Sequence, residues 1–151
     1  MVDLIELPSE TIAAGAMRAA ASVHSLRDVD TLRQAAYQLI DAAGSAGCDT
    51  LIAANAAAEA LTTAAALISD GQLKSGSRRH VGGQKVLIVD AATVTGNNTR
   101  ACAAELRALG VSWVGAVIFD RVRPDLDSLD GDSLLDYVTT LRVLPVHRRS
   151  D

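Results

Sequence analysis

The hydrophobic positions of this chain follow two different patterns. In some segments apolar residues recur at helical spacing or the composition is rich in alanine, and both features favour a helix. In others they form short unbroken runs, which are typical of strands buried on both faces of a parallel sheet. The helical segments are residues 11–23, 32–43 and 55–68. The apolar runs are residues 50–54, 86–90 and 111–119, and a weaker alternation at 139–146 predicts an edge strand.

These elements predict a single α/β domain that spans residues 1–151. Parallel strands need crossover connections, so we expect a central parallel sheet with helices on both faces. Gly44 and Gly47 are expected to end the helix that begins near Leu32. A short helix at residues 133–138 and a short strand at 72–74 complete the prediction.

Size, composition and charge argue against several classes of protein. The chain has 151 residues, of which 49% are hydrophobic and 21% charged, enough for one sizeable core. A formal net charge of −4 argues against general nucleic-acid binding, which needs a concentrated basic surface. The sequence has no apolar stretch of the roughly 20 residues that a membrane helix needs. Its first residues also lack the regions of a secretion signal. We therefore expect a cytoplasmic protein with neither nucleic-acid nor membrane partners.

Several residues that often carry chemistry have an ordinary structural reading here. Cys48 and Cys102 lie far apart without metal-ligand spacing, so both are expected to be free thiols in the core. His24 and His147 lack a nucleophile at a recognisable spacing, which gives a hydrolase triad no support.

A cluster of acids follows the last apolar run. Its spacing is similar to part of a calcium loop, but the terminal bidentate glutamate is absent, so we expect a solvated acidic turn. The four acids are Asp125, Asp127, Asp130 and Asp132.

The stretch with the clearest candidate chemistry is VLIVDAATVTGNNT, which begins at Val86. An apolar strand is predicted to end on Asp90, and a loop follows before a helix that continues to Leu109. Ligands bind at the carboxyl edge of parallel sheets, because helix N-termini point free N–H groups there. The loop is rich in hydroxyl and amide groups, which suits an anion site. Its candidate residues are Thr93, Thr95, Gly96, Asn97, Asn98 and Thr99.

This stretch resembles the signature with which type I phosphoribosyltransferases bind phosphoribosyl diphosphate (PRPP). The signature is a hydrophobic strand, two adjacent acids, a Thr/Ser/Gly-rich loop and a helix. The next strand and the Asp120–Arg121 pair are also similar to the family, particularly to its orotate-type members. The chain departs from the pattern at Ala91, where the second acid would stand, and at Asn98, which intervenes before Thr99.

The resemblance implies binding of PRPP or a nucleotide 5′-phosphate and leaves three functions open. The first is a glycosyltransferase that moves phosphoribosyl to a nitrogenous base and releases pyrophosphate. The second is a binding or regulatory module without turnover, and the third is a structural protein of the same fold, such as a homodimer. By resemblance, Asp90 would hold ribose hydroxyls, residues 95–99 would hold the 5′-phosphate, and Mg²⁺ would bridge the diphosphate and the ribose. Replacing Gly96 by valine is then expected to abolish binding and leave the fold largely intact.

Two further segments are compared with the family. Asn55 opens the turn that holds the diphosphate in the family, here AANAAAEA. Arg78 and Arg79, beside His80, could clamp a diphosphate through their guanidinium forks or belong to a solvated loop. Residues 69–84 are the whole interval in which the family places a further strand and a long catalytic flap, so the flap is expected to be truncated.

Overall fold

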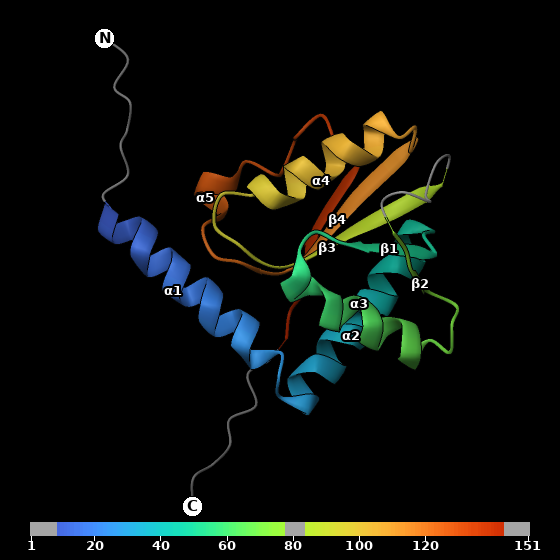
Figure 1. Cartoon of the computed structure of the whole chain (residues 1–151), viewed down its shortest axis with the longest axis horizontal. Coiled ribbons are helices and arrows are strands. Elements are labelled where there is room, and N and C mark those ends of the chain that lie inside the picture. The colour runs from blue at the N-terminus through green and yellow to red at the C-terminus, as the bar shows by residue number, and fades with distance from the viewer. Residues whose placement is uncertain (1–8, 78–83, 144–151) are drawn as a thin grey trace, which may run out of the picture.

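In the part of the chain that the structure describes, five parallel strands form one sheet in the order β2-β1-β3-β4-β5 (Figure 1). The structure is a computed structural model that describes residues 9–77 and 84–143. The predicted α/β fold with a central parallel sheet is confirmed. In the described residues, the elements are α1 (Ser9–Ser25), α2 (Val29–Ala46), β1 (Thr50–Ala53), the 3-10 turn η1 (Ala56–Ala58), α3 (Glu59–Ile68), β2 (Lys74–Ser75), β3 (Lys85–Thr93), α4 (Asn97–Ala108), β4 (Trp113–Arg121), α5 (Pro124–Asp127) and β5 (Tyr137–Thr140).

The two faces of the sheet carry separate hydrophobic cores. On one face, α2 and α3 cover Leu87 and Val89 of β3. On the other, α4 packs on Val86 and Ile88 through Leu106 and its neighbours. Side chains of a strand alternate between the faces, so a strand covered on both sides needs apolar residues at every position. This explains the unbroken apolar run in β3.

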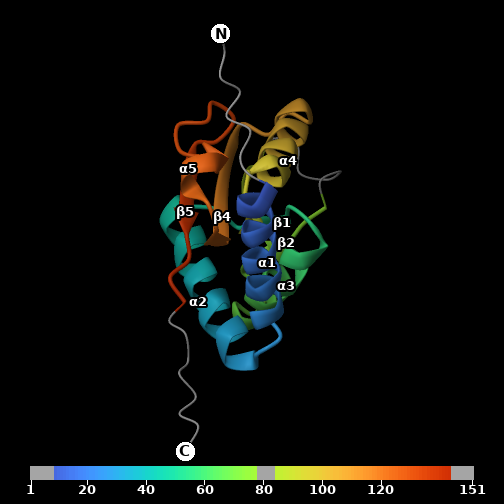
Figure 2. The ribbon, with the colours of Figure 1, turned by 90° about the vertical axis from the view of Figure 1, so that its left-hand side faces the viewer.

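Helix α1 stands apart from these layers and crosses the carboxyl edge of the sheet (Figures 1 and 2). The absence of a side chain at Gly15 allows a close approach to the loop after β3, since a Cβ there would lie 3.2 Å from Val94 Cγ1. Farther along the helix, Arg18 Nη2 and Ser22 Oγ donate to the carboxylate of Asp120 at 3.0 and 2.5 Å. These contacts fix α1 to the end of β4.

Apart from the short helix expected at 133–138, the predicted helices are found, with adjusted ends. Helix α2 ends at Ala46, and Gly47 follows in the left-handed conformation with φ 70°, which a residue without a Cβ adopts at little cost. The segment predicted as a helix from residue 55 begins with the 3-10 turn η1, because the Asn55 side chain caps that turn before α3 starts. The two cysteines, Cys48 and Cys102, are free and buried, as predicted.

Two predictions near the C-terminus are corrected by the structure. The expected edge strand is found as β5, but it occupies Tyr137–Thr140 rather than residues 139–146, of which 144–146 lie outside the described residues. No helix forms at 133–138, because Asp132 binds the backbone at the start of this region and Asp136 binds the backbone of β4. Asp132 Oδ1 accepts from Leu134 N at 2.9 Å, and Asp136 Oδ2 accepts from Val114 N at 2.9 Å. The segment is therefore a turn docked on β4.

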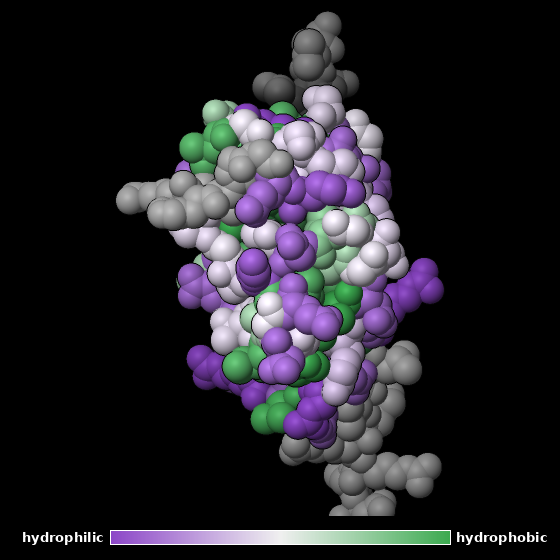
Figure 3. Space-filling view, turned by 90° about the vertical axis from the view of Figure 1, so that its right-hand side faces the viewer, coloured by the Kyte–Doolittle hydropathy of each residue, from purple (hydrophilic) through white to green (hydrophobic). Residues whose placement is uncertain are grey.

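The outer surface adds two observations. On the side away from α1, hydrophilic residues are interspersed with small hydrophobic patches (Figure 3). Among the described helices, none has the length and apolar character needed to cross a membrane.

The expected homodimer is a property of two chains and stays a prediction.

Candidate functional site

Asp90 lies within β3 and not at its end. It pairs with Ile118 of β4, and the ladder continues through Ala92 and Thr93. The shorter neighbour β1 ends beside Val89, so Asp90 stands just beyond the end of β1 while β4 still covers its other side. The residue is only 1% exposed. The sequence-based placement of this acid at the strand terminus is therefore wrong.

The carboxylate of Asp90 connects three elements. Thr99 Oγ1 of α4 donates to Asp90 Oδ2 at 2.9 Å, and Asn55 Nδ2 before η1 donates to Oδ1 at 3.3 Å. Burial raises the pKa of Asp90 above its ordinary value, and these hydrogen bonds oppose the shift. Because only 1% of Asp90 is exposed, the carboxylate offers little surface to a ribose hydroxyl, and its ribose-binding role stays a prediction.

Asn55 and Ala91 are also occupied by structural roles. Asn55 Oδ1 accepts from Ala58 N at 3.2 Å, so both ends of its amide bind the protein. Ala91 is fully buried in the hydrophobic core that also holds Val89 and Val117. A second acid at position 91 would bury its charge among apolar side chains, which is costly without a partner.

The loop after β3, residues 93–99, is called the threonine loop. Thr93 Oγ1 accepts from Gly96 N at 2.7 Å, and Thr95 Oγ1 accepts from Asn97 N at 3.4 Å, so two hydroxyls shape the turn. Gly96 has φ 78° and directly precedes α4. The six predicted site residues in this loop are thus brought together. Thr95, Asn97 and Asn98 are exposed, whereas Thr93, Gly96 and Thr99 are buried.

Arg100, in the first turn of α4, is a candidate site residue that was not singled out from the sequence. Its Nη2 donates to Thr95 O at 2.7 Å and to Asn97 Oδ1 at 2.9 Å, and its Nη1 donates to Asp127 O. In the described part of the chain, no carboxylate lies within ion-pair distance of this guanidinium. A cation in a first turn opposes the helix dipole, and that unusual placement was the available signal.

Two positive features therefore meet at the threonine loop. The first turn of a helix has N–H groups without intrahelical acceptors, and those of Asn98 and Thr99 belong to this set in α4. The helix dipole adds partial positive charge, and the Arg100 guanidinium adds a full one. The loop consequently offers hydrogen-bond donors and positive potential to an anion.

The acidic segment after β4 differs from the expected solvated turn. Asp127 is fully buried and pairs with Arg121, whereas Asp125 and Asp130 are exposed. The hydrogen bonds that Arg121 donates to Asp127 raise the pKa of Arg121 above its usual range. Local composition could not reveal the pairing because burial depends on how the segment folds back on β4.

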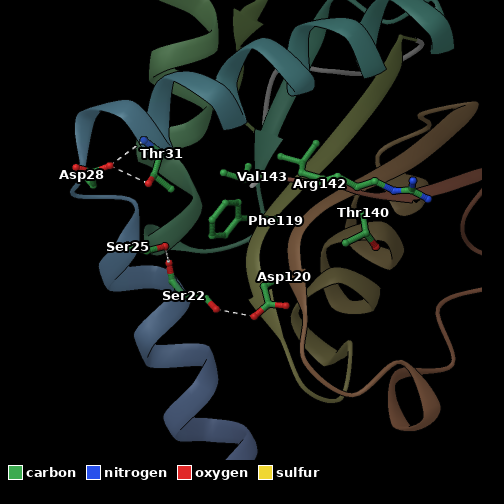
Figure 4. A pocket seen from close by; sticks show the side chains of 10 residues that line it. Ser22, Ser25, Asp28, Thr31, Phe119, Asp120, Thr140, Arg142 and Val143 are labelled. Atoms are coloured by element: carbon green, nitrogen blue, oxygen red, sulfur yellow. Dashed lines mark hydrogen bonds between the residues drawn. The ribbon is translucent and has the colours of Figure 1, made fainter. Parts of the chain in front are cut away.

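A pocket of about 710 Å³ lies between α1, the start of α2 and the ends of β4 and β5 (Figure 4). We call it the edge pocket. Only Asp120 among its residues was noted in the sequence, because the lining comes from three distant segments. The lining residues are Ser22, Ser25, Asp28, Thr31, Phe119, Asp120, Thr140, Leu141, Arg142 and Val143.

The described residues do not fit a magnesium site held by the protein alone. No three His, Cys, Asp or Glu side chains in this part of the chain come together as a metal site. Asp90 is occupied by Thr99 and Asn55, and Ala91 has no ligand atom. Since Mg²⁺ commonly uses one or two carboxylates with substrate phosphates, the expected ion would depend on oxygens of a bound ligand.

The predicted basic residues of the shortened interval, Arg78 and Arg79, lie outside the described residues, as does His80. Their predicted contact with a diphosphate stays a prediction. The strand expected at 72–74 is found as the two-residue β2, Lys74–Ser75.

Comparison with known proteins places the fold. No protein-family model matches the sequence, and no curated protein does. A glutamine PRPP amidotransferase from B. subtilis, solved in complex with ADP and GMP, matches 75% of this chain with TM-score 0.54 and 14% identity. This chain spans only 36% of that protein. A purine phosphoribosyltransferase from Pyrococcus horikoshii matches 78% of this chain and 93% of its own length, with TM-score 0.53 and 15% identity. The chain therefore has a type I phosphoribosyltransferase-like fold, as the motif predicted.

Proposed function

We propose that this chain binds a phosphate-bearing small molecule, PRPP or a nucleoside 5′-phosphate, at the threonine loop and the N-terminus of α4. The observation that carries the proposal is Arg100, whose guanidinium is held inside the loop by Thr95 O and Asn97 Oδ1 without an ion-pair partner among the described residues. The phosphoribosyltransferase-like fold supports the same ligand class.

The expected binding mode follows from the donors at this loop. The phosphate would accept from the backbone N–H groups at the start of α4 and from the exposed side chains of Thr95 and Asn98. Hydrogen bonds to a charged group contribute about 1.5–3 kcal/mol each. A local site of this kind is compatible with the net charge of −4, because screening limits the reach of distant surface charges.

Binding without turnover is the favoured form of this function. Both oxygens of Asp90 accept hydrogen bonds from the protein, and position 91 lies in the hydrophobic core. The acid pair of the resembled family thus has no equivalent pointing to solvent. Phosphoribosyl transfer is the second candidate, supported by the edge pocket at the same edge of the sheet. Its volume is within the roughly 300–1,000 Å³ typical of small-molecule sites.

Calorimetric titration tests the proposal. The ligands are PRPP with magnesium, a nucleoside 5′-monophosphate, inorganic phosphate and, as a control, the unphosphorylated nucleoside. We expect submillimolar binding of the first two and no binding of the nucleoside at the threonine loop. Arg100→Gln should weaken binding about tenfold, since it removes a full positive charge beside the anion, whereas Arg33→Gln, an exposed change on α2, should not.

Two results would decide against the proposal. If neither PRPP nor the nucleoside 5′-monophosphate binds at millimolar concentration, the proposal is refuted. If wild type and a folded Arg100→Gln bind these ligands with equal affinity, the ligand does not bind at the threonine loop. Release of pyrophosphate from PRPP in the presence of a nitrogenous base would favour the second candidate.

Two further expectations concern partners and location, and the geometry of the site does not bear on either. The net charge of −4 argues against nucleic-acid partners. Two buried free thiols, Cys48 and Cys102, are consistent with a cytoplasmic location.

A further inference from the structure

Arg121 and Asp127 form a buried bidentate ion pair beneath the threonine loop. Arg121 Nη2 lies 2.5 Å from Asp127 Oδ1, and Arg121 Nε lies 2.9 Å from Oδ2. The side chains are 9% and 0% exposed, and Arg121 also donates to the exposed Asp130. A bidentate pair fixes the relative orientation of its two backbones, and loss of one buried partner leaves an uncompensated charge.

Asp127 is in turn connected to the threonine loop by two routes. Its Oδ1 accepts from Leu129 N at 3.1 Å, and the Leu129 side chain then lies directly against Gly96. Its backbone carbonyl accepts from Arg100 Nη1, the same guanidinium that donates to Thr95 O. The ion pair, the α5 segment, Arg100 and the loop therefore form one continuous set of contacts.

We propose that Arg121 and Asp127 are positioning residues of the anion site, so that its affinity for phosphate depends on an ion pair that the phosphate does not contact. The inference rests on the proposed function for the anion, but the effect on the loop is independent of any ligand. If Asp127 moves, Arg100 loses an acceptor and Gly96 loses the packing of Leu129. The hydrogen-bond donors of the threonine loop are then less ordered in the free protein. Ordering them when the anion binds costs free energy, which lowers the affinity for the anion.

The chain offers a closely matched control. Arg123 and Asp125 form a second Arg–Asp pair in the same segment, with Nη2 and Oδ2 2.8 Å apart, and Asp125 is 62% exposed. Among the described residues, this pair has no hydrogen bond to the threonine loop. Asp125→Asn and Arg123→Lys therefore repeat the chemistry of Asp127→Asn and Arg121→Lys without the contacts that the inference requires.

The experiment uses NMR hydrogen exchange and calorimetry on the full chain. The amide of Gly96 is the reporter of loop order because it donates to the buried hydroxyl of Thr93 at 2.7 Å. Amides of residues 86–89 in β3 report global stability. Affinity is measured with inorganic phosphate and with a nucleoside 5′-monophosphate. If Asp127→Asn does not fold, Arg121→Lys keeps the charge and alters only the fork, and it then carries the test.

In Asp127→Asn or Arg121→Lys, we expect Gly96 exchange to accelerate about tenfold more than exchange in β3, and phosphate affinity to fall about tenfold. Asp125→Asn and Arg123→Lys should match wild type in Gly96 exchange and in phosphate affinity. Unchanged Gly96 exchange, or equal acceleration in β3, would overturn the inference. If hydrogen exchange at Gly96 is selectively accelerated in these variants but the wild-type protein binds no phosphate, the ion pair orders the loop and the proposed function is refuted instead.

Discussion

The side chain of Leu129 occupies the space into which a side chain at Gly96 would project. A Cβ at Gly96 would lie 2.8 Å from Leu129 Cδ2 and 3.0 Å from Asp127 O, and the residue has φ 78°. From the sequence, Gly96→Val is expected to block an anion and leave the fold largely intact. The structure contradicts the second part, because the substituent would meet the interior of the protein.

Replacing Gly96 by alanine should therefore destabilise the protein more than its backbone conformation alone requires. Gly71 has nearly the same φ, 79°, and a Cβ there would have no described atom within 4 Å, so Gly71→Ala isolates the backbone cost. We expect losses in the free energy of unfolding of about 1 kcal/mol for Gly71→Ala and about 2–4 kcal/mol for Gly96→Ala. Urea denaturation measures both, and equal losses would show that Leu129 yields freely.

Adding a negative charge at the threonine loop should separate affinity from stability. Asn98 is exposed in the first turn of α4, where an acid is favourable to the helix but unfavourable to a bound anion. Asn98→Asp should lower phosphate affinity about tenfold and leave stability unchanged or about 0.3–1 kcal/mol higher. Asn98→Ser is the neutral control. Calorimetry and thermal denaturation read the two effects, and unchanged affinity in Asn98→Asp would place the anion elsewhere.

The buried carboxyl of Asp90 should make stability depend on pH in a defined direction. Burial raises its pKa above the ordinary value of 3.8, so the native state holds this proton more tightly than the unfolded chain does. The contribution of Asp90 to the free energy of unfolding is therefore full below pH 3.8 and falls as the pH rises towards the raised pKa.

Asp90→Asn, which keeps the size of the side chain, removes this dependence. Denaturation of both proteins from about pH 4 to about pH 8 should show wild type losing stability relative to the variant as the pH rises. Other acids are common to both proteins and cancel in the difference. If the difference in the free energy of unfolding between the two proteins stays constant, or grows in favour of wild type as the pH rises, the pKa of Asp90 is not raised in the native state.

Asp120 should control the attachment of α1. It accepts from Arg18 at 3.0 Å and from Ser22 at 2.5 Å, and removing its charge weakens both hydrogen bonds. Asp120→Asn should accelerate hydrogen exchange in α1 about tenfold, since charged hydrogen bonds contribute about 1.5–3 kcal/mol. Exchange in α2 should remain as in wild type. Asp30→Asn, which alters an exposed pair within α2, is the control, and equal exchange in α1 of both variants would refute the attachment.

The sequence predicted what depends on local spacing. The apolar run of β3 and the glycine after α2 specify a strand and a helix end without reference to the rest of the chain. The helix wrongly predicted at 133–138 shows the limit, because Asp132 binds the backbone of Leu134 and Asp136 binds that of Val114 in β4. Helical propensity is weak compared with such contacts.

The candidate site was harder to predict because its partners are distant in the sequence. Asp90 was singled out, but its burial by Asn55 and Thr99 follows only from the folded arrangement. Arg121 and Asp127 were assigned separately to a family-like pair and to a solvated turn, although they bind each other. Patterns along the chain identify residue types, whereas the geometry that joins them is set by tertiary packing.

The register of the sheet has a consequence for how the chain folds. Every ladder joins positions that are far apart in the sequence, such as Thr50 with Val86 and Gly115 with Tyr137. Closing such loops costs entropy before the contacts form, so parallel sheets fold slowly for their size. Strand β1 also lacks its larger neighbour until β3 has been synthesised. Until then, the backbone N–H and C=O groups on that side of β1 have no strand partner, and β3 completes the sheet when it emerges.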